Sequence, residues 1–316
     1  MPVSDLSLTI LGSGGALPVA GRFPSSQYLQ FRNQGFLIDA GEGAQVQMMR
    51  LGVSHGRIGH IFISHLHGDH YLGLMGLLFS MHLSRRTADL HLYSHTGLEE
   101  IIMLQLKMAR SVLSYRIHFH HLTPGAIETI LETDLLTVTA FPLRHRIPCS
   151  GFLFREKPQP RKMNKEKMPE GMLLQHIALL KQGLDVIDET GNVIYPVDAY
   201  TLPPAPLRSY AYCSDTDFFP EIVKTIAGAT LVYHEATFTE ADVTRARETF
   251  HSTAREAATI AKMAGATSLL IGHLSARYRE TDTLLNEARE VFPATEIAAD
   301  GQTHQIDLQA FSPIAE

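Results

Sequence analysis

The pattern of hydrophobic and polar residues changes period repeatedly along the chain. Segments rich in β-branched and aromatic residues predict strands at residues 6–11, 28–31, 35–39, 60–64, 117–122, 135–141, 151–154, 210–213, 230–233 and 268–271. Apolar residues at helical spacing predict helices at residues 42–51, 70–83, 98–115, 172–180, 253–264 and 281–291, with a further helix from Phe218. Strands and helices therefore alternate, which predicts a layered α/β protein whose sheets are covered by helices.

Residues 155–181 depart from this alternation because they are rich in charge and proline. They contain seven Lys or Arg residues and three acidic residues, a local charge of +4 in a chain that carries −10 elsewhere. The composition predicts a segment that projects from the α/β body. Two interpretations stay open: a solvated surface insertion, and a local basic patch for a polyanion.

Composition narrows the class of protein. The chain has 316 residues, 45% of them hydrophobic, which is enough to bury a large core. The N-terminus has no basic and apolar run typical of a secretory signal, and no apolar stretch has the length of a membrane span. The two cysteines, Cys149 and Cys213, have no C-x-x-C spacing and suit a reducing compartment. We therefore expect a cytoplasmic protein that does not associate with membranes.

A metal site is the strongest chemical signal in the sequence. The net charge of −6 does not indicate that the molecule as a whole binds polyanions. The content of 17 histidines is the compositional outlier. Four metal-competent side chains lie within six positions after a predicted strand, His65, His67, Asp69 and His70. Imidazole and carboxylate are ligands that zinc accepts, and the turn at Gly68 lets one loop serve two neighbouring ions.

The motif H-x-H-x-D-H after a strand resembles the signature of the metallo-β-lactamase superfamily. The resemblance implies an α/β fold of four layers, an αββα sandwich, and two Zn²⁺ ions per subunit, with Mn²⁺ or another divalent ion as an alternative. It implies that Asp39 is mainly structural. It also implies three further ligands, each after a later predicted strand: His145 for the first metal, Asp215 as the bridge, and His273 for the second metal.

A second histidine cluster is less informative. His118, His120 and His121 lie in a predicted strand and have no acidic neighbour in the sequence. We expect these imidazoles to lie on the surface.

Two later segments, 232–238 and 251–254, resemble the loops that characterise the ribonuclease Z family. His251 lies just before a predicted helix, and a histidine titrates near neutral pH, so we expect it to act as the general acid and Glu235 to orient it. Ser252 and Thr253 precede a predicted helix, so they are expected to cap it and also to meet a substrate phosphate.

The same resemblance covers essentially the whole chain, as one domain of residues 1–316 with an arm inserted at residues 155–207. It implies a homodimer that binds precursor tRNA, with sequence-independent contacts from the arm residues Lys162, Lys165 and Lys167. Arg22 is the one basic residue kept in the family's substrate loop at residues 18–23, in which Ala20 and Phe23 replace a lysine and an asparagine.

The resulting hypothesis is a zinc-dependent endoribonuclease that cleaves a phosphodiester near the 3′ end of precursor tRNA and leaves a 3′-hydroxyl. Asp69 is expected to bind metal and to orient or accept the proton of the attacking water. Three alternatives stay open: a phosphodiesterase for a small-molecule or other nucleic-acid diester, a lactonase or thioesterase, and a non-catalytic protein that uses the metals structurally.

Overall fold

The computed structural model describes residues 6–19 and 21–311. Ala20, one of the two replacements in the 18–23 loop, lies outside these described residues. The chain divides into two compact units. Residues 132–137 and 155–207 form the smaller unit, which we call the inserted unit, and the remainder forms the main unit.

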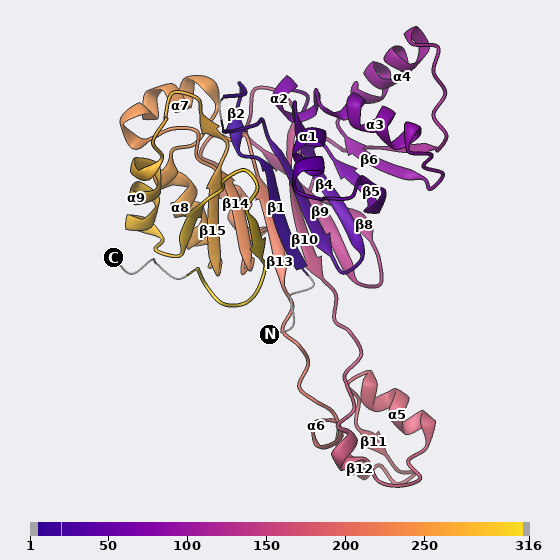
Figure 1. Ribbon diagram of the computed structural model, residues 1–316. Helices are drawn as coiled ribbons and strands as arrows, with labels where there is room; N and C mark the ends of the chain where they lie inside the picture. Colours follow the sequence, from indigo (N-terminus) through magenta and orange to yellow (C-terminus); the bar gives the residue numbers. More distant parts are fainter. Residues whose placement is uncertain (1–5, 20, 312–316) are drawn as a thin grey trace. The chain divides into compact units, whose positions relative to one another are not determined.

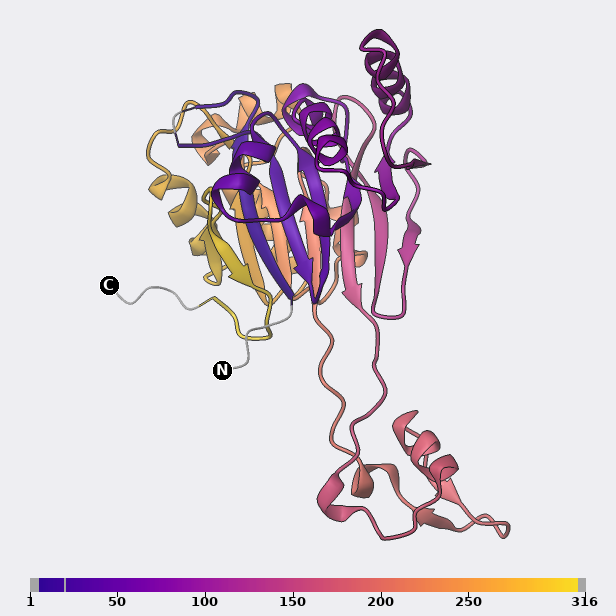
Figure 2. The ribbon, with the colours of Figure 1, turned by 45° about the vertical axis from the view of Figure 1, so that its right-hand side comes forward.

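Two large sheets form the centre of the main unit (Figures 1 and 2). Within the described residues, the first has the strand order β18 (Thr303–Gln305), β1 (Leu6–Gly12), β3 (Ser26–Phe31), β4 (Gln34–Ala40), β5 (Ile58–Phe62), β6 (Leu90–Ser94) and β7 (Ile117–His121). The second has the order β17 (Thr295–Ile297), β15 (Ser268–Gly272), β14 (Leu231–Glu235), β13 (Ser209–Cys213), β10 (Cys149–Glu156), β9 (Leu136–Leu143) and β8 (Glu128–Glu132). A short pair joins β2 (Gly14–Gly15) to β16 (Leu274–Ser275).

Helices cover the outer face of each sheet (Figures 1 and 2). The first sheet packs against α1 (Ala44–Arg50), α2 (Gly68–Tyr71), α3 (Leu74–Leu83) and α4 (Leu98–Met108). The second packs against α8 (Ala254–Met263) and α9 (Asp282–Val291), and α7 (Val243–Thr249) precedes them in the chain. Leu37 and Ile61 point to the helices, whereas their strand neighbours Phe36 and Phe62 contact Phe154 of the opposite sheet. This alternation produces the predicted αββα sandwich.

The topology brings distant segments to one edge of the sandwich. Strands β4, β5, β6 and β7 run parallel, and so do β13, β14, β15 and β17. The carboxyl ends of parallel strands meet at the same edge of a sheet, where α/β proteins commonly bind ligands. The motif at residues 65–70, Asp215 and His273 each follow such an end, after β5, β13 and β15.

Several predicted helices differ from the observed ones. The helix predicted at residues 98–115 ends at Met108, because Arg110 adopts a left-handed backbone (φ 48°) and the buried Tyr115 donates a hydrogen bond to the Leu78 carbonyl. The helix predicted from Phe218 is only a 3₁₀ turn at Pro220–Lys224. The helix predicted at residues 70–83 breaks near Gly73, whose N–H binds the Ala40 carbonyl. Here the backbones approach so closely that an added Cβ would lie 2.2 Å from the Gly41 oxygen.

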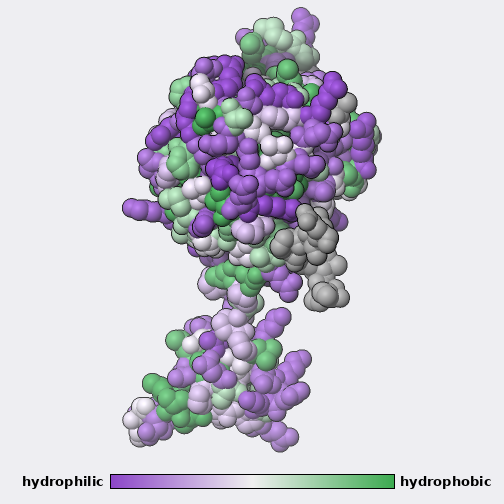
Figure 3. All heavy atoms as spheres, turned by 90° about the vertical axis from the view of Figure 1, so that its left-hand side faces the viewer, coloured by the Kyte–Doolittle hydropathy of each residue, from purple (hydrophilic) through white to green (hydrophobic). Residues whose placement is uncertain are grey.

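The inserted unit has its own small framework. It contains the 3₁₀ turn Lys165–Lys167, helix α5 (Leu174–Lys181), the hairpin of β11 (Val186–Ile187) and β12 (Val193–Tyr195), and helix α6 (Val197–Tyr200). Residues 182–207 carry four acidic residues and no Lys or Arg, so the insertion at 155–207 has as many acids as bases. Its basic residues are therefore concentrated in the first half. Figure 3 shows hydrophilic and hydrophobic side chains in separate patches of this unit.

Among the described residues, no helix combines the length and the apolar character that a membrane-spanning helix requires.

Candidate metal centre

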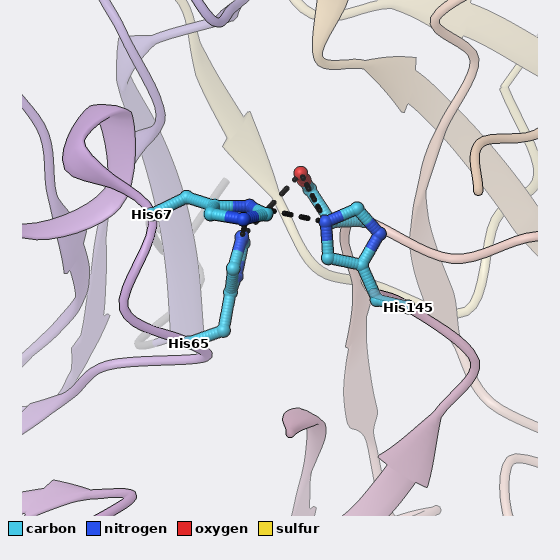
Figure 4. Close-up of side chains that lie close together, drawn as sticks. His65, His67 and His145 are labelled. Atoms are coloured by element: carbon cyan, nitrogen blue, oxygen red, sulfur yellow. Dashed lines mark hydrogen bonds and ion pairs between the residues drawn. The ribbon is translucent and has the colours of Figure 1, made fainter. Parts of the chain in front are cut away.

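Three histidines and one aspartate converge at the edge of the sandwich. The imidazoles of His65, His67 and His145 point toward one another (Figure 4), and His67 Nδ1 lies 3.0 Å from His65 Nε2 and 3.1 Å from His145 Nε2. One carboxylate oxygen of Asp215, Oδ2, lies 3.6 Å from His65 Nε2 and 3.8 Å from His145 Nε2. Burial lowers the pKa of each of these imidazoles and so favours the neutral form that binds a metal.

A second group lies on the other side of Asp215. Its other oxygen, Oδ1, is 3.1 Å from His273 Nε2 and 3.3 Å from His70 Nε2. The Asp69 carboxylate is 3.4 Å from His273 Nε2 and 3.5 Å from His70 Nε2. Asp215 therefore offers one oxygen to each group, which is the arrangement of a carboxylate that bridges two sites. Burial alone would raise the pKa of Asp215, but the surrounding imidazoles, His273 first, hold it well below its usual range.

In three of these imidazoles, a neighbour holds the nitrogen that faces away from the cluster. His70 Nδ1 lies 2.7 Å from Asp39, His145 Nδ1 lies 3.0 Å from the Phe250 carbonyl, and His65 Nδ1 lies 3.1 Å from the Ser64 hydroxyl. Such outer contacts fix ring orientation and leave the inner nitrogen free to bind a metal. The Asp39 carboxylate also accepts hydrogen bonds from Ser64 and from the Tyr212 hydroxyl, as expected for a structural residue.

The donor set fits a divalent metal. The ligand atoms of His65, His67, His145 and Asp215 lie within 4.8 Å of one another, and so do those of Asp69, His70 and His273. Nε2 of the fully buried His70 faces the cluster and has no hydrogen-bond partner. A buried polar atom without a partner is unfavourable, and a bound metal ion would supply one. The backbone is also strained here. Among the described residues, five of the eight non-glycine residues with positive φ lie in or beside the cluster, Ala16, Asp39, Asp215, Phe250 and His273. Each costs about 1–3 kcal/mol, and strain of this kind concentrates at functional sites.

A carboxylate–imidazole pair lies beside these two groups of side chains. His251 Nδ1 is 2.7 Å from Glu235 Oε1, and Glu235 is completely buried. Burial would lower the pKa of His251, but the nearby carboxylates, Glu235 first and then Asp215 and Asp69, together raise it to about 9. The paired carboxylate therefore favours the protonated form of the His251 imidazole, which is the form that can donate a proton.

These residues open into one cleft of about 440 Å³. Four histidines line it, His67, His145, His251 and His273, and so do the apolar residues Ala16, Pro18, Pro24 and Leu72. Arg146 and Glu42 also line it. The sequence reasoning did not single out these two residues. Arg146 directly follows the predicted ligand His145, and that position is the signal that would have revealed it.

The remaining predicted residues are placed differently. Arg22 donates a hydrogen bond to the Tyr278 carbonyl (2.5 Å), and the Ser252 hydroxyl donates to the Thr216 carbonyl (2.7 Å). Thr253 caps α8 and forms a capping box with Glu256, as expected from its position. None of these three side chains is among the residues that line the cleft. Lys162 and Lys165 line a separate groove of the inserted unit, and Lys167 is exposed.

Two histidines of the cluster at residues 118–121 contact acidic residues that are distant in the sequence. His118 Nε2 lies 2.7 Å from Asp89, and His121 Nε2 lies 3.1 Å from Glu99. His120 Nε2 lies 2.9 Å from His91 Nδ1. His121 is exposed as expected, whereas His118 and His120 are half-buried.

The comparisons with known proteins identify the family. A family described as "Anti-Pycsar protein Apyc1" matches residues 6–157. Ribonuclease Z of Bacteroides fragilis is 45% identical over 303 residues, which cover 94% of this chain and 98% of that protein. The chain belongs to the ribonuclease Z family.

Solved structures agree with the family and its fold. The crystal structure of human tRNase Z, short form, is 26% identical and has a TM-score of 0.70, with 95% of this chain and 99% of that chain covered. A metallo-β-lactamase fold protein from Bacillus subtilis is 19% identical and has a TM-score of 0.68, with 95% and 98% covered. The predicted metallo-β-lactamase sandwich is thereby confirmed. Members of the ribonuclease Z family are hydrolytic enzymes, and the His and Asp clusters indicate a divalent metal site.

Proposed function

We propose that this chain is an endoribonuclease that hydrolyses a phosphodiester near the 3′ end of precursor tRNA and leaves a 3′-hydroxyl. One observation carries the proposal: the cleft that holds Asp215 also holds the His251 imidazole, which is paired with the buried carboxylate of Glu235. Kinship with ribonuclease Z of Bacteroides fragilis and with human tRNase Z supports tRNA as the substrate.

The metal ligands are assigned from the two groups around Asp215. One ion would be held by His65, His67 and His145, the other by Asp69, His70 and His273, and Asp215 would bind both. We propose Zn²⁺ at both sites, since imidazole and carboxylate suit zinc, with Mn²⁺ as the alternative. When bound, such ions supply Lewis-acid chemistry and a water of lowered pKa.

The protein side chains have separate tasks in this reaction. The Asp69 carboxylate faces the cleft, accepts a hydrogen bond from Ala16 N–H (2.8 Å), and is assigned to orient the attacking water or take its proton. His251 is assigned to protonate the departing 3′ oxygen, while Glu235 stabilises the imidazolium through its 2.7 Å contact. Arg146 lines the same cleft and supplies a positive charge for the phosphate backbone.

Arg22, Ser252 and Thr253, which were expected to contact the substrate, form hydrogen bonds within the protein. The Arg22 side chain joins the loop at residues 18–23 to the Tyr278 carbonyl. The Ser252 hydroxyl joins the segment that contains His251 to the Thr216 carbonyl. Thr253 fixes the first turn of α8. We propose that these three side chains serve the substrate by shaping the loops around the cleft.

Incubation of the purified protein with a 3′-extended tRNA transcript tests the proposal. We expect one cut near the 3′ end of the mature tRNA, a 3′-hydroxyl on the upstream product, and loss of cleavage in the presence of a chelator. Scattered cuts, or cleavage that chelators do not affect, would contradict it.

A smaller substrate is the alternative, since the cleft volume lies within the range of small-molecule pockets. A chain selected for a small diester would hydrolyse a cyclic nucleotide with a far higher kcat/KM than precursor tRNA. A matched comparison of the two substrates distinguishes the functions.

The inserted unit is proposed to hold tRNA through its basic half. Lys162 and Lys165 line a groove of about 570 Å³, and Lys167 is exposed beside them in the chain. We expect Lys162→Gln combined with Lys165→Gln to raise KM for precursor tRNA. In a plot of the logarithm of the binding constant against the logarithm of salt concentration, the slope should become less steep by about one to two. Hydrolysis of a small diester should not change. The matched control is Lys224→Gln with Lys262→Gln, two exposed lysines of the main unit.

We also propose a homodimer, formed through an apolar surface on α1, α3 and α4. Met49 and Leu83 are 75% and 77% exposed and line one cleft between α1 and α3, and Met108 of α4 is 70% exposed. Apolar surface of this kind on a folded protein indicates a binding face. Leu83→Glu should shift the sedimentation coefficient to that of a monomer, whereas Met263→Glu on α8 should not. A wild-type protein that is monomeric at every concentration would contradict the proposal.

The cytoplasm is the proposed location. Cys149 and Cys213 are free thiols and both are buried, which suits a reducing compartment.

A further inference from the structure

The hydroxyl of Thr237 lies between the catalytic pair and a metal ligand. Its Oγ1 is 2.7 Å from Glu235 Oε2 and 2.9 Å from His273 Nδ1. The residue is buried, with 6% of its surface exposed, so water does not replace these contacts readily. Thr237 follows β14, and its own N–H also donates to Glu235 Oε2 (3.0 Å).

The hydrogen-bond directions follow from the donors available. A threonine hydroxyl has one proton to donate and lone pairs to accept with. The closest acceptor is the carboxylate of Glu235, which is a stronger acceptor than the His273 carbonyl at 3.0 Å. Once the hydroxyl donates to Glu235, it accepts the proton of His273 Nδ1. His273 Nε2 is then unprotonated, and this is the nitrogen that lies 3.1 Å from Asp215 and 3.4 Å from Asp69.

We propose that Thr237 is a positioning residue that links the metal ligand His273 to Glu235. This inference rests on the proposed metal-dependent function. Glu235 then serves two imidazoles: Oε1 holds His251 directly, and Oε2 holds His273 through the Thr237 hydroxyl. The acid and one metal ligand are thereby fixed by the same buried carboxylate.

The other ligand contacts show why the link is specific to one metal site. His145 is oriented by a main-chain carbonyl and His70 by Asp39, so neither depends on Thr237. Removal of the hydroxyl should therefore weaken only the site that contains His273. The loss expected for such an outer contact is about 10–100-fold in metal affinity.

Zn²⁺ titration against a competing chelator tests the inference without reference to activity. Thr237→Val keeps the size and the branched shape but removes the hydroxyl. We expect one ion to bind as in the unmodified protein and the other to bind about 10–100-fold more weakly. Thr237→Ser restores the hydroxyl and should restore the affinity of both ions. Should Thr237→Val fail to fold, Thr237→Ala carries the same prediction without a second methyl group at the hydroxyl position.

Thr239→Val is the matched control. Thr239 is equally buried, with 6% exposed, but its contacts are to Tyr278 and none is to an imidazole. Unchanged affinity for both ions in a folded Thr237→Val or Thr237→Ala protein would overturn the inference. Absence of Zn²⁺ binding by the unmodified protein would instead overturn the proposed function on which it rests.

Discussion

The His251→Ala variant is expected to keep both metal ions and to lose most of its turnover on precursor tRNA. His251 contributes no ligand in the proposed assignment, since both ions have complete sets without it. The Glu235 carboxylate raises the pKa of His251 and is positioned to hold the imidazolium, so the imidazole is suited to donate a proton. General acid catalysis contributes about 10²–10⁴-fold in rate, so the single-turnover rate should fall by that factor.

Metal content and rate must be measured on the same preparation, because one cluster of ligand atoms groups His251 with Asp215 and His273. Loss of a bound ion in His251→Ala would show that this imidazole is a ligand, contrary to the assignment. Full RNA cleavage by the variant would refute its role as the acid. His118→Ala is the control, because this half-buried histidine pairs with Asp89 outside the cleft.

Asp215→Ala should have the largest effect of any single substitution. Both carboxylate oxygens face ligand groups, Oδ2 toward His65 and Oδ1 toward His273, so the substitution removes a ligand from both sites at once. We expect the variant to bind fewer than two ions and cleavage to become undetectable, since most of an enzymatic acceleration of roughly 10⁶-fold or more depends on the metals here.

The neighbouring Asp217 supplies the control for that substitution. Its carboxylate accepts a hydrogen bond from Arg247 (2.7 Å) and does not line the cleft. Asp217→Ala should retain both ions and more than about a tenth of the activity, since a partly exposed ion pair contributes only about 0–1 kcal/mol. Retention of two tightly bound ions by Asp215→Ala would contradict the bridging role.

The side chains proposed as ligands could be predicted from the sequence because each one follows a strand. His145, Asp215 and His273 come after β9, β13 and β15, and the topology brings these strand ends together. Only a few side-chain types bind metal ions, so few residues at these strand ends are candidate ligands. The pattern of hydrophobic and polar residues likewise predicted most strands, because this pattern is a local property of the sequence.

The groups that orient the ligands were not predictable in the same way. The Phe250 carbonyl that holds His145 and the Ala16 N–H that holds Asp69 are main-chain atoms, which every residue carries. Both positions require a left-handed backbone, and neither sequence position is a glycine that would signal it. The end of helix α4 was predicted wrongly for a related reason. The helix ends where Arg110 adopts a left-handed backbone and Tyr115 contacts Leu78, and no glycine or proline in the sequence marks this position.

Charge in the inserted unit was predicted only in part. The basic run at residues 155–181 is evident in the sequence, and the acidic residues that follow bring the insertion to equal numbers of acids and bases. Electrostatic attraction of tRNA to this unit must therefore act at short range, through the Lys162 and Lys165 groove.

A metal-anomalous diffraction map of zinc-loaded crystals, combined with elemental analysis of the same protein, tests the central claim most directly. The claim is that side chains from four separate segments, residues 65–70, His145, Asp215 and His273, hold two neighbouring ions. Two peaks per chain, about 3.5–4 Å apart and on either side of Asp215, are predicted. Fewer than one bound ion per chain under metal-replete conditions, or peaks away from His65, His145 and His273, would contradict it.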